Sequence, residues 1–326
     1  MNASSACFLG LDIAKAKADV CLLRPDGQRF EHSFASTRQG HRSLLDWLEK
    51  HAPSAAVRAG LESTGPYARA WCDLLHTAGH DVRLLNPARP KAYAQACGLR
   101  NKTDQVDARL LAQFVAEQKA DRWTPPDPHR EELKELTRRR EDLLALRQSE
   151  RNRQESARAQ SIRDSLARTI KSLDKELARV ESDLEELVAR SASLRQEESL
   201  LCSIPGIGKV TARKILAELP AVDRFESARK AAAYAGLSPR RHESGSSVRK
   251  RGRLSKVGNG GLRKALYLPA MTAIKFNPII KSFAERLRKN GKAEKAIVGA
   301  AMRKLLHIVY GVLKHKSTFD PNRVAS

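Results

Sequence analysis

The sequence predicts an α/β N-terminal domain, a long helical central region and a mostly α-helical C-terminal domain. Three observations carry this prediction. Short apolar runs alternate with helical patterns before residue 120, residues 130–198 contain neither Gly nor Pro, and helical patterns return after residue 200. Strands followed by strand–helix alternation are typical of a mixed sheet with helices packed on it. We expect domains at residues 1–124, 125–198 and 199–326.

The N-terminal domain is expected to begin with strands and to continue as strand–helix pairs. "FLGLDIAKAKADVCLL" indicates two apolar strands around a turn, and "PDGQ" is a further turn. Pro66 near the start and Gly79 just past the end are boundary signals of a helix that "STGPY" opens. In chain order, the expected elements are two strands within 8–23, a strand "RFEHSFAS", a helix at 41–50, a strand at 55–62, a helix ending before Gly79, a strand at 81–87 and a helix at 103–119.

The central region begins after "WTPPDPH", residues 123–129, which breaks the pattern and indicates a domain boundary. Apolar residues then step by four and three with charges on the flanks, which is a heptad pattern. It predicts a long antiparallel helical hairpin or a dimeric coiled coil that mediates self-association, and favours these over one ordinary core helix. The seam consists of Ile162, Leu166, Ile170, Leu173, Leu177, Val180, Leu184 and Leu187.

The C-terminal domain opens on "IPGIGKVTA", residues 204–212, which resembles the hairpin of a helix-hairpin-helix motif. Gly206 and Gly208 let the backbone turn tightly, so that its N–H groups can approach a phosphate, and Lys209 adds positive charge. The alternative is a turn between two helices that binds nothing. A helix around 224–235 and further helices from about 259 to 314 are expected to complete this domain.

A strongly basic stretch lies inside the C-terminal domain. From Ser238 to Lys264 there are nine basic residues and one acidic residue, Glu243, and Gly and Ser are interspersed among them. This composition predicts a loop laid along a nucleic-acid backbone, although charge runs are more often solvated faces. The expected nucleic-acid contacts are Arg240, Arg241, Arg249, Lys250, Arg251, Arg253 and Lys256.

The overall charge also indicates a polyanionic partner. The chain has 326 residues, a formal net charge of +23 and a pI near 10.2. Nucleic acid is the leading candidate, and an acidic membrane surface is the alternative. Because aromatic residues make up only 5% of the chain, Lys and Arg contacts to a duplex backbone are favoured over ring stacking on single strands.

Several other classes are disfavoured by the composition. No uninterrupted apolar run approaches the roughly 18 residues of a membrane span, and Asp12 falls within the apolar run near the N-terminus, so neither a membrane anchor nor a signal peptide is expected. The five cysteines are scattered without a C-x-x-C pair, which argues against zinc and a disulfide framework. A reducing cytoplasm fits this cysteine usage.

Four carboxylates occupy unusual places for so basic a protein. Asp12 lies inside an apolar strand, Glu62 ends another, and Asp104 and Asp107 stand at a helix start. Each has an ordinary explanation: a turn residue, a solvated strand end, and helix caps. Brought together, however, they would repel one another unless cations neutralised them. Hard oxygen ligands select Mg²⁺ or Mn²⁺, and a pair of such ions supports phosphodiester chemistry.

The order "GLDIAK", "LESTG" and "NKTDQVDARLLA" resembles the Asp–Glu–Asp–Asp signature of a RuvC-like, ribonuclease-H-type fold. It is similar in particular to the DEDD transposases of the insertion-sequence "one-ten" family, which are bridge-RNA-guided recombinases. The resemblance extends over the whole chain, including the central coiled coil and the C-terminal transposase domain. It implies that Asp12, Glu62, Asp104 and Asp107 hold Mg²⁺ or Mn²⁺, and favours this role over capping.

A second motif, "AGLSPRRHESGSSVRKRGRLSK", carries the same resemblance. It implies that a serine attacks the DNA phosphate and becomes covalently attached. The matching residue is Ser244, and Ser246 and Ser247 are the alternatives. The family pattern further implies donor and target double-stranded DNA, a non-coding guide RNA, a homo-oligomer that shares a composite site between subunits, and a cytoplasmic, nucleoid-associated protein.

Two other functions remain open from the residues themselves. A RuvC-like structure-specific nuclease would need the carboxylates but would attack with water in place of Ser244. A non-catalytic architectural protein would bridge duplexes through basic residues alone and would need none of the four acids.

Overall fold

The computed structural model describes residues 6–53, 55–63, 65, 67–98, 104–244 and 248–322; of residues 104–106, 240–244 and 248–253 it describes the backbone alone. The chain divides into two compact units, Met1–Pro125 and Pro126–Ser326. Each unit has its own hydrophobic core.

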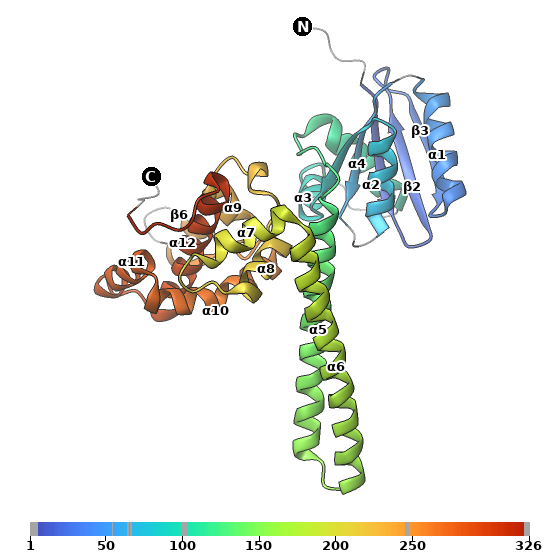
Figure 1. Cartoon of the computed structure of the whole chain (residues 1–326). Helices are drawn as coiled ribbons and strands as arrows, with labels where there is room; N and C mark the ends of the chain where they lie inside the picture. Colours follow the sequence, from blue (N-terminus) through green and yellow to red (C-terminus); the bar gives the residue numbers. More distant parts are fainter. Residues whose placement is uncertain are drawn as a thin grey trace. The chain divides into compact units, whose positions relative to one another are not determined.

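The first unit is built on a mixed sheet (Figure 1). In the described part of the chain the sheet has five strands in the order β3-β2-β1-β4-β5. β1 pairs antiparallel with β2 and parallel with β4; β2–β3 is antiparallel and β4–β5 is parallel. The strands are β1 (Phe8–Ile13), β2 (Lys17–Leu23), β3 (Arg29–Ala35), β4 (Arg58–Glu62) and β5 (Asp81–Leu85).

Helices cover both faces of this sheet, as the apolar side chains of the strands require. α1 (Arg38–His51) and α2 (Tyr67–Thr77) contribute Leu44 and Trp71 to the larger core, which they share with Leu9 and Leu61 of the strands. α4 (Asp104–Glu117) packs on the opposite face. The predicted strands and helices of this unit are therefore present.

Two details of this unit differ from the predictions. α1 begins three residues earlier than expected, because the Thr37 side chain accepts a hydrogen bond from the Gly40 amide at 3.2 Å and caps the helix. A short helix, α3 (Ala88–Ala96), was not anticipated, since it has no apolar stripe. Tyr93 connects α3 to α4 through an edge-to-face contact with Phe114, with the ring centroids 5.5 Å apart.

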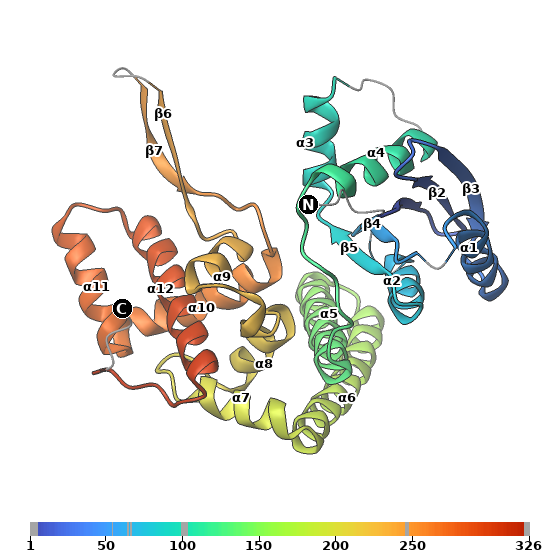
Figure 2. The same ribbon diagram turned by 90° about the horizontal axis from the view of Figure 1, so that it is seen from above.

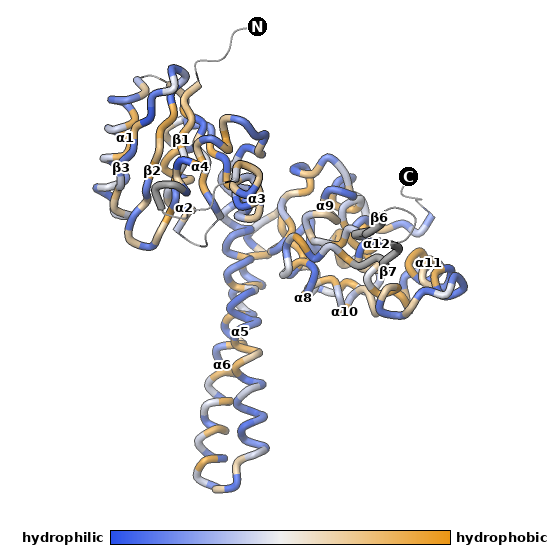
Figure 3. Tube along the Cα trace, turned by 180° about the vertical axis from the view of Figure 1, so that it is seen from behind, coloured by the Kyte–Doolittle hydropathy of each residue, from blue (hydrophilic) through white to orange (hydrophobic). Residues whose placement is uncertain are grey.

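The second unit begins with an antiparallel helical hairpin of α5 (Pro128–Ser156) and α6 (Gln160–Arg190). The order of its cross-helix ion pairs shows the antiparallel arrangement: Arg140 with Glu181, then Arg147 with Asp174. Figure 3 shows the hairpin as predominantly hydrophilic with scattered hydrophobic positions. The hairpin alternative predicted for residues 130–198 is thus observed.

The apolar seam of α6 is buried only in part. Leu177, Leu184 and Leu187 are buried near the root of the hairpin, whereas Ile162 near the tip is 53% exposed. Opposite the tip, residues 147–156 of α5 contain no apolar side chain. Contacts within the hairpin therefore bury the half of the α6 seam near the root and leave the half near the tip exposed.

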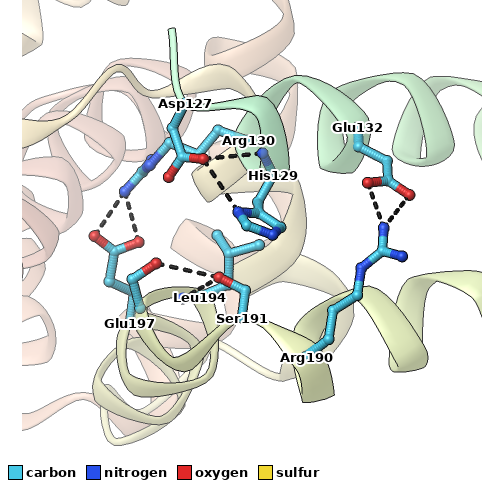
Figure 4. A network of polar contacts seen from close by, with 9 residues as sticks. Asp127, His129, Arg130, Glu132, Arg190, Ser191, Leu194 and Glu197 are labelled. Atoms are coloured by element: carbon cyan, nitrogen blue, oxygen red, sulfur yellow. Dashed lines mark hydrogen bonds and ion pairs between the residues drawn. The ribbon is translucent and has the colours of Figure 1, made fainter.

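A polar network fixes the root of the hairpin to the helices that follow (Figure 4). The Arg130 guanidinium donates to both carboxylate oxygens of Glu197 and, at 3.2 Å, to the Leu216 carbonyl. Arg190 pairs with Glu132 across the hairpin. The buried Ser191 caps α7 (Ala192–Cys202) by accepting from the Leu194 amide.

Beyond the hairpin, the second unit is mainly helical. Its largest core combines the root of the hairpin with residues from the helices that follow. These elements are α7, α8 (Lys209–Glu218), a 3₁₀ turn η1 (Val222–Arg224), α9 (Ala228–Tyr234), α10 (Gly260–Phe276), α11 (Pro278–Lys289) and α12 (Glu294–His315).

α12 is long and apolar enough to cross a membrane by length and composition alone, although Arg303, Lys304 and His307 interrupt it. In the structure 56% of its most apolar window is buried inside the protein. Leu305 and Val309 are fully buried in the core of the second unit. α12 is therefore a core helix of this unit.

The basic stretch after Ser238 is not the loop that the composition predicts. It forms a two-stranded antiparallel ribbon, β6 (Pro239–Ser244) and β7 (Val248–Leu254), and α10 then starts at Gly260. Figure 2 shows the ribbon projecting from the helices of its unit. Cross-strand backbone hydrogen bonds hold these residues extended, a pairing that a charge-rich composition does not reveal.

Candidate active site

Two of the predicted acids lie side by side on adjacent strands. The parallel register of β1 and β4 pairs Leu11 with Leu61, so the next residues, Asp12 and Glu62, are neighbours across the sheet. Because alternate strand residues share a face, both carboxylates project on the side opposite Leu11 and Leu61, which is the side covered by α4. Both side chains are partly exposed.

Two glycines allow α4 to lie directly on this face. Gly10 and Gly60 pair with each other two residues before the acids. A methyl group on Gly10 would overlap the Ala108 carbonyl oxygen, and one on Gly60 would lie 2.5 Å from Val115 Cγ1. The sequence reasoning missed these glycines, although a glycine inside a strand signals a close backbone approach.

The first turns of α4 bring Asp107 to the same face. Asp107 directly precedes Ala108, whose carbonyl oxygen lies over Gly10, and its side chain is partly buried. α4 starts at Asp104, so the backbone places Asp104 in the same first turn, while its side chain lies outside the described residues. Asp12, Glu62 and Asp107 thus lie at the interface of the sheet and α4, and the backbone of Asp104 lies in the same first turn of α4 as Asp107.

An ion pair holds α4 in this position at the other edge of the sheet. Arg109 Nη2 donates to Glu31 Oε2 on β3 at 2.8 Å, and Arg109 Nε donates to the other oxygen. The hydrogen bond from Arg109 lowers the pKa of Glu31, so the pair stays charged at neutral pH.

Carboxylate oxygens are hard ligands, so the chemistry of these side chains fits a hard divalent cation. Among the residues that the structure describes, no group of three carboxylate, imidazole or thiolate side chains is assembled as a ready metal site. The side chain of Asp104, the remaining predicted ligand, lies outside the described residues.

A further acid and a lysine border these carboxylates and were not predicted. Asp19 on β2 is paired directly with Asp12 and is only 6% exposed. Lys17 Nζ lies 2.7 Å from Asp19 Oδ2. A pocket lined by Asp19, Val20, Glu31, His32 and Ser33 opens beside this row. An aspartate inside a second apolar strand, "KADVCLL", was the available signal.

Two buried thiols of the first unit are poor nucleophiles. Burial raises the pKa of Cys21 to about 11 and that of Cys72 to about 12. Thiolate, not thiol, is the reactive form. No disulfide joins the five cysteines, all of which lie in described segments.

Ser244 is the last residue of β6, paired with Val248 at the outer end of the ribbon. Its side chain and those of the predicted contacts Arg240, Arg241, Arg249, Lys250, Arg251 and Arg253 lie outside the described residues, as do Ser246 and Ser247 altogether. Lys256, at the base of the ribbon, is exposed.

Asn259 anchors the base of the ribbon. Its Nδ2 donates to Glu218 Oε2 at 2.9 Å and to the Tyr234 hydroxyl at 3.2 Å. Its Oδ1 accepts from the Leu262 amide and caps α10. The ribbon is therefore tied at one end to the helical core of its unit.

The predicted hairpin between α7 and α8 is present as a turn between two helices. Ile204 and Ile207 are buried, whereas Gly208 and Lys209 are exposed. Gly206 has a φ of 102° and packs against the α10 backbone. No side chain caps α8 at Gly208, so the first amides of α8 are available to an anion.

Acids on adjacent strands beneath a helix, in a sheet of this order, are consistent with a RuvC-like domain and with metal-dependent nucleic-acid chemistry. Comparisons with known proteins define the family. A DEDD transposase model of IS110 type matches residues 9–160, and the family described as transposase IS116/IS110/IS902 matches residues 198–285.

Several relatives extend over most of the chain. The pilin gene-inverting proteins of Moraxella bovis and Moraxella lacunata are each 34% identical over 324 residues, which cover 97% of this chain and 98% of each relative. The transposase for insertion sequence element IS1111A of Coxiella burnetii is 24% identical over 79% of this chain and 75% of its own length. The chain belongs to the IS110/IS116/IS902 family of DEDD transposases. Membership implies an enzyme that acts on DNA and uses a divalent metal ion.

Proposed function

We propose that this protein is a site-specific DNA recombinase that cleaves and rejoins donor and target DNA through a covalent serine intermediate, guided by a non-coding RNA. The carboxylates Asp12, Glu62, Asp104 and Asp107 hold Mg²⁺ or Mn²⁺, and Ser244 is the nucleophile. The observation that carries the proposal is the packing of α4 on Gly10 and Gly60, which brings Asp107 to the face that carries Asp12 and Glu62.

The reaction exchanges one phosphodiester for another. The Ser244 oxygen forms a bond to the scissile phosphorus, the bond from phosphorus to one deoxyribose oxygen breaks, and the departing oxygen takes up a proton as the serine hydroxyl loses its own. The number of phosphodiester bonds is unchanged, so no energy source is required. A divalent cation at the carboxylates supplies Lewis-acid activation of the phosphate. Asp12 and Glu62 are fixed on core strands, which keeps these two ligands oriented.

DNA rearrangement is supported by the relatives. The Moraxella proteins, which align with nearly the whole chain, are named for inverting a pilin gene. Inversion requires strands to be cut and rejoined, so a recombinase with a covalent intermediate explains such an activity better than a hydrolytic nuclease. A non-catalytic architectural protein is disfavoured by membership of a transposase family.

Self-association is part of the proposal. The half-exposed seam at the tip of α6 carries Ile162 at 53% exposure, and α5 offers no apolar side chain opposite it. A coiled-coil contact with a second copy would bury this stripe. The dimer or tetramer so formed is proposed to combine the carboxylates of one subunit with the serine of another. The guide RNA would bind the basic surface that gives the chain its net charge of +23.

The decisive experiment looks for a covalent protein–DNA adduct. The full-length protein is mixed with RNA transcribed from the flanks of its element, donor DNA, target DNA and Mg²⁺, and the products are separated on a denaturing gel. We expect an adduct that requires RNA and either Mg²⁺ or Mn²⁺, and that disappears in Ser244→Ala. The matched controls are Ser246→Ala and Ser247→Ala, which should retain it.

Two outcomes would change the assignment. Loss of the adduct in Ser246→Ala or Ser247→Ala, with Ser244→Ala active, would move the nucleophile within the motif. Metal-dependent cleavage without an adduct, equal in wild type and Ser244→Ala, would identify a hydrolytic nuclease instead.

A further inference from the structure

α10 is apolar on two sides, but only one of them is buried. Leu262, Leu266 and Ala273 face the core of the second unit and are fully buried. Leu268 and Met271 stand on the other side of the helix and are 69% and 43% exposed. A helix that is apolar all round is typically covered all round. The exposed side of α10 is therefore a candidate contact surface.

The exposed residues form one stripe along α10. They follow one another at intervals of three, one, three and four positions, which places them on the same face of the helix. The stripe consists of Lys264, Tyr267, Leu268, Met271 and Lys275, all of them exposed. Three apolar side chains thus occupy its middle, and a lysine stands at each end. Exposed apolar groups that are bounded by polar residues are typical of interaction surfaces.

The rest of the second unit holds this helix firmly. The turn between α7 and α8 packs against its backbone, so that a methyl group on Gly206 would lie 3.1 Å from the Pro269 carbonyl oxygen. Asn259 caps its first turn by accepting from the Leu262 amide at 2.9 Å. Side chains on a packed and capped helix keep their positions when they press against a partner.

The charge around the stripe selects the kind of partner. Residues 244–284, which include α10, contain nine Lys or Arg residues and no Asp or Glu. A second copy docked through the same face would bring like charges together, because a two-fold contact repeats one patch on both sides. A polyanion complements this charge, and the family acts on DNA. Duplex DNA is therefore the favoured occupant.

The dimensions of the stripe fit a DNA groove. Lys264 and Lys275 are about 16 Å apart along the helix, so their side chains can reach phosphates on both sides of a groove about 6 to 12 Å wide. Leu268 and Met271 lie between these lysines. Proteins that bind the minor groove frequently insert Leu, Met or Phe side chains between base pairs, which unstacks one step and bends the duplex.

We propose that the exposed face of α10 docks on the minor groove of the DNA substrate, where Leu268 and Met271 insert between adjacent base pairs, unstack them and bend the duplex. Lys275 contacts a flanking phosphate. No covalent bond forms or breaks in this step. The proposal goes beyond the serine chemistry and does not depend on it, because unstacking requires neither Ser244 nor a metal ion.

The test measures unstacking without cleavage. The full-length protein is bound, in EDTA and without RNA, to a matched duplex or to one with a single mismatch beside a 2-aminopurine. Wild type should bind the mismatched duplex about fivefold more tightly, because part of the unstacking cost is already met there. It should also raise the 2-aminopurine fluorescence by about threefold and bend the duplex, as measured by energy transfer between its ends.

The double variant Leu268→Ala/Met271→Ala removes the two inserted side chains. It should bind the two duplexes within about twofold of each other and keep less than about a quarter of the fluorescence increase. Since both residues are exposed, the variant should unfold thermally close to wild type. Met271→Leu keeps an apolar side chain of similar volume and should behave as wild type.

Two further variants separate insertion from charge and from general stickiness. Lys275→Gln should weaken binding to both duplexes alike and reduce the slope of log Kd against log salt by about one, with the fluorescence increase unchanged at saturation. Phe276→Ala is the matched control, because Phe276 is also 69% exposed on α10 but lies outside the stripe. It should retain the preference for the mismatched duplex.

Three results would overturn the proposal. One is a wild-type protein that neither raises the fluorescence nor prefers the mismatch. Another is an equal loss in Phe276→Ala. The third is a double variant that unstacks DNA normally but sediments as a smaller species, which would make this face a contact between copies of the chain. Unstacking by a wild-type protein that forms no covalent adduct would refute serine recombination and leave the role of α10 intact.

Discussion

The two units present their proposed reactive groups in opposite ways. In the first unit, Asp12 and Glu62 extend from strands whose neighbours Leu11 and Leu61 are completely buried, and α4 lies directly on these strands. In the second unit, Ser244 lies at the outer end of a two-stranded ribbon, whose base is tied to the core of that unit. The acids are therefore placed on the strands of a packed core, whereas Ser244 is placed on a ribbon that projects from a core.

This difference fits the roles proposed for the two sets of groups. Metal ligands must keep their geometry to within a fraction of an ångström, which packed strands and a covering helix provide. A nucleophile that attacks DNA has to reach a phosphate, and a ribbon with one fixed end provides that reach. We therefore expect changes in packing to affect the acid site, and changes at the base of the ribbon to affect Ser244.

The strongest test of this comparison inactivates the two halves of the proposed site, the carboxylates and Ser244, in separate proteins. Asp12→Asn and Ser244→Ala should each reduce adduct formation by about 1,000-fold or more while leaving DNA affinity within about twofold. If the halves come from different subunits, mixing the two inactive proteins should restore about a quarter of the wild-type adduct, because random exchange yields half heterodimers with one intact site each. A mixture as inactive as its components would place both halves in the same subunit.

A smaller effect is expected from disturbing the packing of the acid site. Gly10→Ala should push α4 away from the sheet and destabilise the protein by about 1–3 kcal/mol, measured by denaturant unfolding. It should also raise the Mg²⁺ concentration needed for activity. Gly311→Ala is the control: nothing lies within 4 Å of a methyl group there, and α12 should gain up to about 1 kcal/mol. Unchanged metal dependence in a destabilised Gly10→Ala would show that α4 does not orient the ligands.

The anchor of the ribbon should show the converse behaviour. Asn259→Ala removes the cap of α10 and the bonds to Glu218 and Tyr234, and should cost about 1–2 kcal/mol. We expect slower adduct formation at an unchanged Mg²⁺ requirement, because the acids lie in the other unit. Asn290→Ala, at the end of α11, serves as the control. A shifted metal requirement in Asn259→Ala would break the separation between the two regions.

The smallest effect concerns the ion pairs that join the hairpin to its unit. Burial alone would raise the pKa of Glu141, but Lys214 at 2.6 Å and Lys264 at 3.3 Å hold it below the usual value. A lowered pKa stabilises the fold above the unfolded-state pKa and loses this contribution as the pH falls through the folded-state value. Glu141→Gln should therefore lower stability by about 1 kcal/mol or less at pH 7.

The pH profile supplies the check on that last prediction. Unfolding curves of wild type and Glu141→Gln should converge only once the pH falls below the lowered folded-state pKa of Glu141, where the carboxyl is protonated in both states. A difference that persists to lower pH would mean that Glu141 acts by packing and not by charge.

The sequence by itself determined the elements whose patterns are local. Apolar alternation predicted the strands of the sheet, proline and glycine signals bounded α2, and heptad spacing predicted the hairpin. The order of "GLDIAK", "LESTG" and "NKTDQVDARLLA" predicted the acids and indicated the family, and the comparisons with known proteins confirm the family. These features need only neighbouring residues, or a motif order, to be recognised.

Only the tertiary structure decided the features that depend on distant partners. The ribbon requires the pairing of "PRRHES" with "VRKRGRL". Glycine is needed at position 10 because the backbone of Ala108, nearly a hundred residues away, lies directly on it. Lys17 and Asp19 lie beside the predicted acids because the register of β1 and β2 pairs Asp19 with Asp12. Register and close packing are collective properties of the folded chain, since a shift of one residue would turn every side chain of a strand to the other face.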